Sequence, residues 1–116
     1  MSGHVTVQSN HARNEPATVD LTTGELLDLF GDQYTRRVYE AVVEQPRCGR
    51  AVAEAADVSR ATAYRRLNAL RDAGLVRTEQ TIRTDGHHRE QFEAVPTSIS
   101  VSVSQNGLET AVGGAD

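Results

Sequence analysis

The chain of 116 residues is poor in cysteine, lysine and aromatic side chains: it holds one cysteine, no lysine and 4% aromatic residues. A tetrahedral soft-metal site needs about four nitrogen or sulfur ligands, and one cysteine with four scattered histidines does not supply a spaced set. We therefore expect no metal and no cofactor. The sequence also lacks a glycine-rich phosphate loop, a nucleophile elbow and convincing paired carboxylates, which indicates that the protein is not an enzyme.

Long apolar runs are absent as well. No stretch approaches the ~18 apolar residues of a membrane helix, and no charged and then apolar signal opens the chain. Secretion and a membrane span are therefore disfavoured, and a cytoplasmic protein is expected. The length predicts one domain with one modest core, and 38% hydrophobic residues with few aromatics predict an aliphatic interior.

The absence of lysine leaves arginine as the only strong cation, and acidic residues outnumber it by 16 to 12. An acidic, lysine-free chain suggests a salt-rich cytoplasm, whereas a GC-rich codon bias would favour arginine without any demand on the protein; the sequence does not separate the two. In molar salt, phosphate contacts lose affinity steeply. A protein that binds nucleic acid in such salt must depend more on base contacts and on the shape of the duplex.

The charge is unevenly distributed along the chain. Residues 47–89 hold nine arginines and five acids, a net charge of +4, whereas residues 1–46 (three arginines, seven acids) and 90–116 (four acids) each carry −4. A chain polarised in this way can present one cationic face to phosphate while the remainder is repelled.

Residues 50–76, RAVAEAADVSRATAYRRLNALRDAGLV, predict two short helices joined by a tight turn. Ser59 is placed to cap the second helix, residues 60–73, and Gly74 to end it in a left-handed residue. This order of parts is typical of a helix-turn-helix. Apolar residues recur on one stripe of each helix: Val52, Ala53 and Ala56 in the first, and Ala63, Leu67 and Leu70 in the second.

A β-hairpin is predicted directly after the second helix. Leu75 and Val76 open a stretch that runs to Ile82, the Asp85-Gly86 pair marks a turn, and the segment 91–95 returns. These strands form a two-stranded wing over residues 77–93. Cationic and imidazole side chains gather at its tip: Arg83, His87, His88 and Arg89.

Two further helices are predicted ahead of the motif. Thr22 or Thr23 could cap the first, Gly31 would separate it from the second, and Pro46 would end the second. The buried stripe of the second of these helices is Val38, Ala41 and Val42.

Three segments of the chain carry a resemblance to a known family: VSRATAYRRLNALRDAGLVR, RTDGHHREQFEAV and the preceding DQYTRRVYEAVVEQP. They resemble the winged helix-turn-helix transcriptional regulators, specifically the small ArsR-like or TrmB-like regulators of halophilic archaea. The resemblance covers residues 26–95 and implies sequence-specific binding of double-stranded DNA, usually as a homodimer. Metal-sensing relatives carry cysteine at the reading helix; here the only cysteine, Cys48, precedes the motif, so metal sensing is not expected. Cys48 is either inert or a redox switch through an intermolecular disulfide.

The expected fold is mainly α with a small β-wing, a winged helix-turn-helix over residues 21–95. Residues 1–20 are expected to be a disordered arm, because they are polar and the short alternation at residues 4–7 is too weak to predict a strand. Residues 96–116 predict a C-terminal β-hairpin or tail, with a turn at Asn106-Gly107. Its apolar face, with Ile99, Val101 and Val103, either packs on the same chain or serves as a dimer interface.

The candidate DNA-binding residues are the helix cap, the outward polar residues of the second helix and the wing cations: Ser59, Arg60, Thr62, Tyr64, Arg65, Asn68, Arg77, Arg83, His87, His88 and Arg89. Arg65 and Arg66 are adjacent and cannot share one face, so we take Arg65 as the reader and Arg66 as a solvated or intrahelical ion-pair residue. Tyr64 could contact phosphate or sugar, or rest against the first motif helix. The Thr62 hydroxyl could touch DNA or bond within its own helix.

Two functions fit these residues. In the leading hypothesis a dimer places helix 60–73 in the major groove and the wing on the flanking backbone or minor groove, and so blocks or recruits the basal transcription machinery. The alternative is a winged-helix module that binds protein rather than DNA. An interaction module should present an apolar patch on the second helix, whereas this helix presents arginine, threonine, tyrosine and asparagine.

Overall fold

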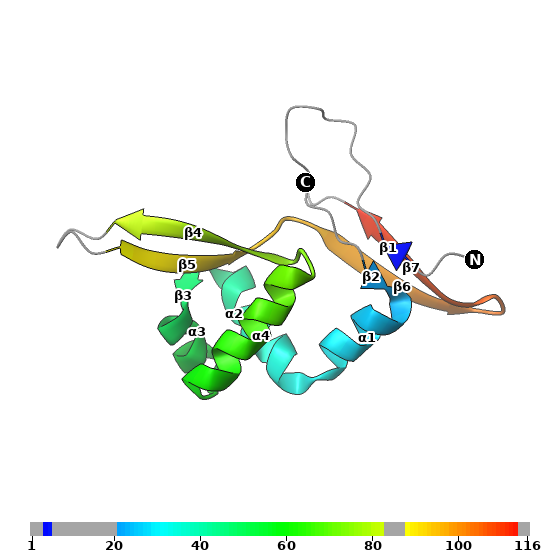
Figure 1. The fold of residues 1–116 in the computed structure, drawn as a ribbon. Coiled ribbons are helices and arrows are strands. Elements are labelled where there is room, and N and C mark those ends of the chain that lie inside the picture. Colours follow the sequence, from blue (N-terminus) through cyan, green and yellow to red (C-terminus); the bar gives the residue numbers. More distant parts are fainter. Residues whose placement is uncertain (1–3, 6–20, 83–87, 114–116) are drawn as a thin grey trace, which may run out of the picture.

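The computed structural model describes residues 4–5, 21–82 and 88–113, and it builds them into four helices and seven strands (Figure 1). The helices are α1 (Thr23–Gly31), α2 (Gln33–Glu44), α3 (Gly49–Ala56) and α4 (Arg60–Asp72). The strands are β1 (His4–Val5), β2 (Leu21–Thr22), β3 (Arg47–Cys48), β4 (Val76–Ile82), β5 (His88–Ala94), β6 (Ser98–Ser104) and β7 (Gly107–Gly113). In this part of the chain no helix is both long and apolar enough to cross a membrane.

The first two helices begin at side-chain caps. Of the two threonines predicted to cap α1, Thr22 does so: its Oγ1 accepts from the Glu25 amide at 3.0 Å, and the Glu25 carboxylate accepts from the Thr22 amide at 2.9 Å. Helix α1 ends at Gly31, as predicted, and Asp32 then caps α2 by accepting from the Thr35 amide at 2.9 Å. Helix α2 ends at Glu44, two residues before Pro46.

The helix-turn-helix forms as predicted. Helix α3 ends at Ala56; its C-cap Asp57 has a left-handed φ of 58°, and the amide of Val58 then donates to the Ala53 carbonyl at 3.0 Å. Ser59 caps α4, and Gly74 follows that helix with a φ of 84°. The regular part of α4 ends at Asp72, with Ala73 as its C-cap, so the predicted range of 60–73 extends one residue too far.

The core lies where α2, α3 and α4 meet the wing. Phe92 of β5 is 1% exposed and is the largest fully buried side chain among the described residues. Each such apolar side chain contributes ~1.5–3 kcal/mol relative to remaining in water. The predicted stripes of α2, α3 and α4 are all buried in this core, together with Leu75, Val76 and Phe92: Val38, Ala41, Val42, Val52, Ala53, Ala56, Ala63, Leu67 and Leu70.

The wing is a three-stranded sheet in the order β3-β5-β4, with all neighbours antiparallel. Strands β4 and β5 confirm the predicted hairpin; its predicted turn at residues 84–86 lies outside the described residues. Strand β3 was not predicted, because two residues directly after Pro46 are too few to show an alternating pattern. It pairs Arg47 with Phe92 and Cys48 with Gln91, and so ties the start of α3 to the wing.

The expectation that no strand forms in the amino-terminal arm was wrong at two residues. His4–Val5 pairs antiparallel with Leu21–Thr22, directly before α1. The partner is 16 or more residues away in the chain, so no local pattern reveals the pairing. The rest of the predicted disordered arm lies outside the described residues.

The predicted C-terminal hairpin is present as β6 and β7, but its turn is displaced by one residue. Ser104 pairs with Gly107, so Gln105 and Asn106 form the loop and Gly107, with a φ of 99°, follows it. Ile99 and Val112 face each other and pack on the core, and the hydroxyls of Thr23 and Thr110 share a hydrogen bond of 2.6 Å. The base of the hairpin therefore packs on its own chain. The wing and this hairpin extend in opposite directions from the helices (Figure 1).

Candidate nucleic-acid interface

Helix α4 is held by one face and leaves the opposite face in solvent. Ala63, Leu67 and Leu70 are each 0% exposed and anchor it in the core. With 3.6 residues per turn, Arg65 lies roughly opposite this stripe and is exposed. Arg60 is also exposed, on the flank of the first turn. Neither guanidinium forms a hydrogen bond or an ion pair with the described part of the chain, so both keep their donors for an external partner.

Ser59 and Thr62 use their hydroxyls within the helix start. The Ser59 Oγ accepts from the Thr62 amide at 3.1 Å and lies 3.0 Å from the Thr62 Oγ1, to which it donates. This arrangement satisfies one of the orphaned amides of the first turn. Of the two roles considered for the Thr62 hydroxyl, the structure therefore has it bonded at the start of its own helix.

Tyr64 packs against α3, the first helix of the motif. This is one of the two roles that the sequence left open for it. Its ring meets the ring of Phe92 edge-on, with centroids 6.2 Å apart, and lies so close to Gly49 that a Cβ there would overlap it. The residue is nevertheless 41% exposed. It therefore ties α4 to the start of α3 and to the wing while its remaining surface faces solvent.

Of the two adjacent arginines, Arg65 and Arg66, it is Arg66 that forms an ion pair. Its partner precedes α2 and does not belong to α4 itself. The Arg66 Nε donates to the Asp32 Oδ2 at 2.7 Å, and the Arg66 side chain is 27% exposed. The same carboxylate oxygen accepts from the Thr35 amide and, at 2.8 Å, from the Thr35 hydroxyl. The hydrogen bond from the Thr35 side chain is the main cause that lowers the pKa of Asp32, partial burial opposes it, and Arg66 acts in the same direction as Thr35.

Asn68 follows Arg65 on the outer face of α4 and is exposed. Its Oδ1 accepts from a terminal nitrogen of Arg71 at 3.2 Å, which leaves the amide nitrogen as a donor. Helix α4 carries four arginines and one acid, within a chain of net charge −4. It is therefore a cationic element in an acidic protein.

The described part of the wing is less cationic than the sequence suggested. Arg77 and Glu93 face each other across β4 and β5, and the Arg77 Nε donates to the carboxylate at 2.6 Å. Arg89 lies opposite Thr81 and donates to the Cys48 sulfur at 3.5 Å. His88 begins β5, and Arg83 and His87 lie outside the described residues. Three glutamates share β4 and β5 with these two arginines: Glu79, Glu90 and Glu93.

A comparison with known protein families matches residues 32–98 to the family described as sugar-specific transcriptional regulator TrmB. These 67 of 116 residues run from the cap of α2 through the helix-turn-helix and the wing to the start of β6. The chain belongs to the TrmB family. This result confirms the predicted winged helix-turn-helix and, of the two resemblances, the TrmB-like one. No curated protein is found to match the chain.

Membership of the TrmB family places the chain among transcriptional regulators and not in a class of enzymes, and it implies DNA as a partner in general. The α4 face described above lies inside the matched segment. Among the described residues, no three histidine, cysteine or acidic side chains come together as a metal site.

Cys48 lies at the junction of β3 and α3. It is half-buried, belongs to β3 and is the residue that precedes α3, without capping it through its side chain.

Sequence reasoning missed one residue that orients the site. Asp32 joins the start of α2 to α4, but from the sequence it is only an acid between two helices. Its spacing of three residues to Thr35 is a capping signal, whereas its distance of 34 residues from Arg66 hides the ion pair.

Proposed function

We propose that this TrmB-family chain regulates transcription by binding double-stranded DNA sequence-specifically, with α4 in the major groove. The observation that carries this proposal is the exposed face of α4, where Arg65 extends from a helix anchored on its other side by buried Ala63 and Leu67; Arg60 is exposed on the flank of the first turn. A guanidinium with unoccupied donors matches the two acceptors of guanine in the major groove. Arg65 is the base reader, and Arg60 contacts bases or the adjacent phosphate.

The rest of the outer face of α4 suits a close approach to bases. Ala61 and Asn68 lie on the same arc as Arg65 and are exposed. An alanine methyl can pack against a thymine methyl, and an asparagine can bond to adenine. Ala61 therefore joins the candidate contacts, although a small apolar side chain gave no sign of this in the sequence.

The wing contacts the flanking backbone or minor groove through its tip. Arg77 is paired with Glu93, and three glutamates lie on β4 and β5, so the described part of the wing offers little attraction to phosphate. The cations expected from the sequence at the tip, Arg83, His87 and His88, are the natural contacts there. Of the wing residues, we therefore assign the phosphate contact to Arg83 in particular.

The protein acts as a homodimer in the cytoplasm, where occupancy of an operator blocks or recruits the basal transcription machinery. Two-fold dimers read palindromic operators, whose half-sites lie about 34–36 Å apart. The family description also names sugar specificity, which we do not extend to this chain. Its cavity beneath β6 is lined mainly by leucine, phenylalanine, isoleucine and valine, a poor match for a sugar.

The test is selection of bound duplexes from a pool of genomic fragments at several salt concentrations. Wild type and Arg36→Ala should enrich the same sequences, whereas Arg65→Ala should lose preference at one base position. Arg36 is the matched control because it lies on α2, is exposed and bonds to the Phe30 carbonyl. Failure of the wild type to enrich any duplex at any salt concentration would rule out the proposal.

A further inference from the structure

Strand β6 is an edge strand that lacks the usual protection. Among the described residues its only hydrogen-bonded strand neighbour is β7, so one row of its amides and carbonyls has no strand partner. Proteins commonly guard such edges with charged residues, proline or a bulge. Strand β6 reads SISVSVS and pairs with β7 without interruption, so it contains none of these. The companion strand β7 carries Glu109 and lies against β1.

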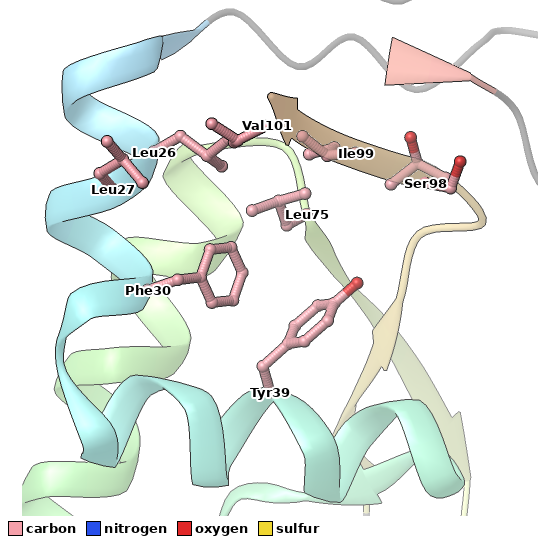
Figure 2. A pocket seen from close by; sticks show the side chains of 9 residues that line it. Leu26, Leu27, Phe30, Tyr39, Leu75, Ser98, Ile99 and Val101 are labelled. Carbon is pink, nitrogen blue, oxygen red and sulfur yellow. The ribbon is translucent and has the colours of Figure 1, made fainter. Parts of the chain in front are cut away.

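The apolar residues of β6 become more exposed toward the tip of the hairpin. Ile99 packs on the core, Val101 is 38% exposed and Val103 is 80% exposed. Ile99 and Val101 also line a cavity of about 420 Å³ between β6, α1 and α2, into which Phe30 points from α1 and Tyr39 from α2 below (Figure 2). An apolar group placed beside β6, on the face of Ile99, would therefore find apolar surface.

The sequence of β6 is chemically the same in both directions. Read from either end it alternates serine with a β-branched residue, and Val101 is its centre. When two copies pair antiparallel about Val101, each serine faces a serine and Val101 faces its own copy. Val103 then faces Ile99 of the second copy, on the side of the sheet that lines the cavity. An isologous two-fold interface requires this kind of self-complementarity.

The absence of charge on β6 also favours a second copy of the chain as the partner of its free edge. Strand β6 holds no charged residue, so pairing it with a second copy of itself brings no like charges together. Neither a basic nor an acidic partner would find a complementary charge on this strand. An uncharged, self-complementary edge fits itself.

We propose that two copies of the chain dimerise by antiparallel pairing of β6 with β6, centred on Val101, so that the two hairpins form one four-stranded sheet. This proposal specifies the interface of the homodimer proposed above and rests on it. Because the hairpin and the wing extend in opposite directions, the pairing leaves α4 and the wing free for DNA (Figure 1). A two-fold axis midway between the two Val101 residues relates the two α4 helices, as a palindromic operator requires.

The register can be tested by single cysteines in a Cys48→Ser background, which removes the native thiol. Directly opposed residues in antiparallel strands have Cα atoms about 4.5–5.5 Å apart, within the range of a disulfide. Val101→Cys should therefore form a covalent dimer under mild oxidation. Val103→Cys should not, although Val103 is more exposed, because the two copies would lie about 14 Å apart at ~3.4 Å per residue. Equal cross-linking of both variants would overturn the register.

Sedimentation of the protein without DNA tests whether the free edge of β6 forms the dimer interface. Val103→Lys places a charge at the paired edge and should shift the protein to monomer. The matched control is Leu108→Lys, because Leu108 lies directly opposite Val103 on the same face but in β7, away from the proposed edge. Dissociation by both substitutions would indicate packing of the hairpin faces and would contradict edge pairing, as would a wild type that is monomeric at every concentration.

The DNA-binding proposal and this one fail separately. Monomeric Val103→Lys should still bind a single half-site and lose the gain in affinity from a palindrome. If the wild type binds a half-site and a palindrome with equal affinity and sediments as a monomer, the pairing is wrong and the DNA proposal stands. A dimer with the predicted cross-link that binds no duplex would refute the DNA proposal instead.

Discussion

Arg66 of α4 donates to Asp32 of α2 at 2.7 Å, and the oxygen that accepts this bond also accepts from the amide and the hydroxyl of Thr35. One carboxylate thus caps α2 and ties α4 to it. The buried stripe of Ala63, Leu67 and Leu70 directs the neighbouring Arg65 away from the core. The adjacent arginines have separate roles: one holds the helix and the other is available to DNA.

The lowered pKa of Asp32 predicts that the folded protein loses stability in acid. Because its pKa is lower in the folded protein than its ordinary value, its contribution is complete above that ordinary value, ~3.9, and is lost as the pH falls through the folded pKa. Asp32→Asn should lower the melting temperature at pH 7 and should flatten its fall below pH 5. The measurement is the melting temperature from pH 7 to pH 3. If the melting temperature of Asp32→Asn falls below pH 5 as steeply as that of the wild type, other carboxylates cause the fall.

Substitution of the two adjacent arginines should separate stability from DNA binding. Arg65→Ala should leave the melting temperature unchanged and should cost about 1–3 kcal/mol in binding to the preferred duplex, with relaxed preference at one position. Arg66→Ala should lower the melting temperature, because it leaves Asp32 with one partner fewer, and should weaken binding without changing base preference. Thermal melts and duplex titrations on both variants test this. A change of base preference in Arg66→Ala alone would reverse the two roles.

Gly49 has no room for a side chain. A Cβ there would overlap the ring of Tyr64, so Gly49→Ala should destabilise the fold by about 1–3 kcal/mol, as overpacking does, and should displace Tyr64 from Phe92. Denaturant unfolding measures the cost, and Tyr64→Ala should relieve most of it in the double variant. Gly24→Ala is the control: it lies in α1 with nothing within 4 Å of the added Cβ, and it should be neutral or stabilising. Equal costs at both glycines would contradict the proposed overlap.

The two ends of the wing should differ in their effect on salt dependence. Arg83→Ala, at the tip, should weaken binding to all duplexes alike and reduce the slope of log K against log salt by about 1. Arg77→Ala should change the slope less, because Glu93 already neutralises that guanidinium. Titrations at four or more salt concentrations give both slopes. A larger change for Arg77→Ala would place the phosphate contact at the base of the wing.

Local patterns in the sequence were enough to predict the helix-turn-helix. Its signals act within a few residues: Ser59 caps the helix that follows it, Gly74 ends it, and Leu67 recurs at helical spacing from Ala63. The wing was predicted for the same reason, from two alternating segments around an Asp-Gly pair. What was missed depends on distant partners. Strand β3 exists because Phe92 lies beside Arg47, and the role of Arg66 depends on Asp32, 34 residues away.

The C-terminal hairpin shows a smaller limit of local reasoning. The Asn-Gly pair correctly indicated a turn, but Gly107 takes its positive φ just after the loop rather than within it. The register is set by burial of Ile99 and Val112 against the core, which the turn residues alone do not reveal. Among the candidate DNA contacts, the exposure of Arg65 could be predicted from the helical pattern, whereas the pairing of Arg77 with Glu93 could not.

The most direct test of the central claim is a titration of the purified chain with its best enriched duplex and with a shuffled duplex of equal composition, across salt concentrations. The account predicts tighter binding to the enriched duplex at every salt concentration, with a preference that persists at high salt, and a loss of this preference in Arg65→Ala but not in Arg36→Ala. Equal affinity of the wild type for both duplexes throughout would contradict it.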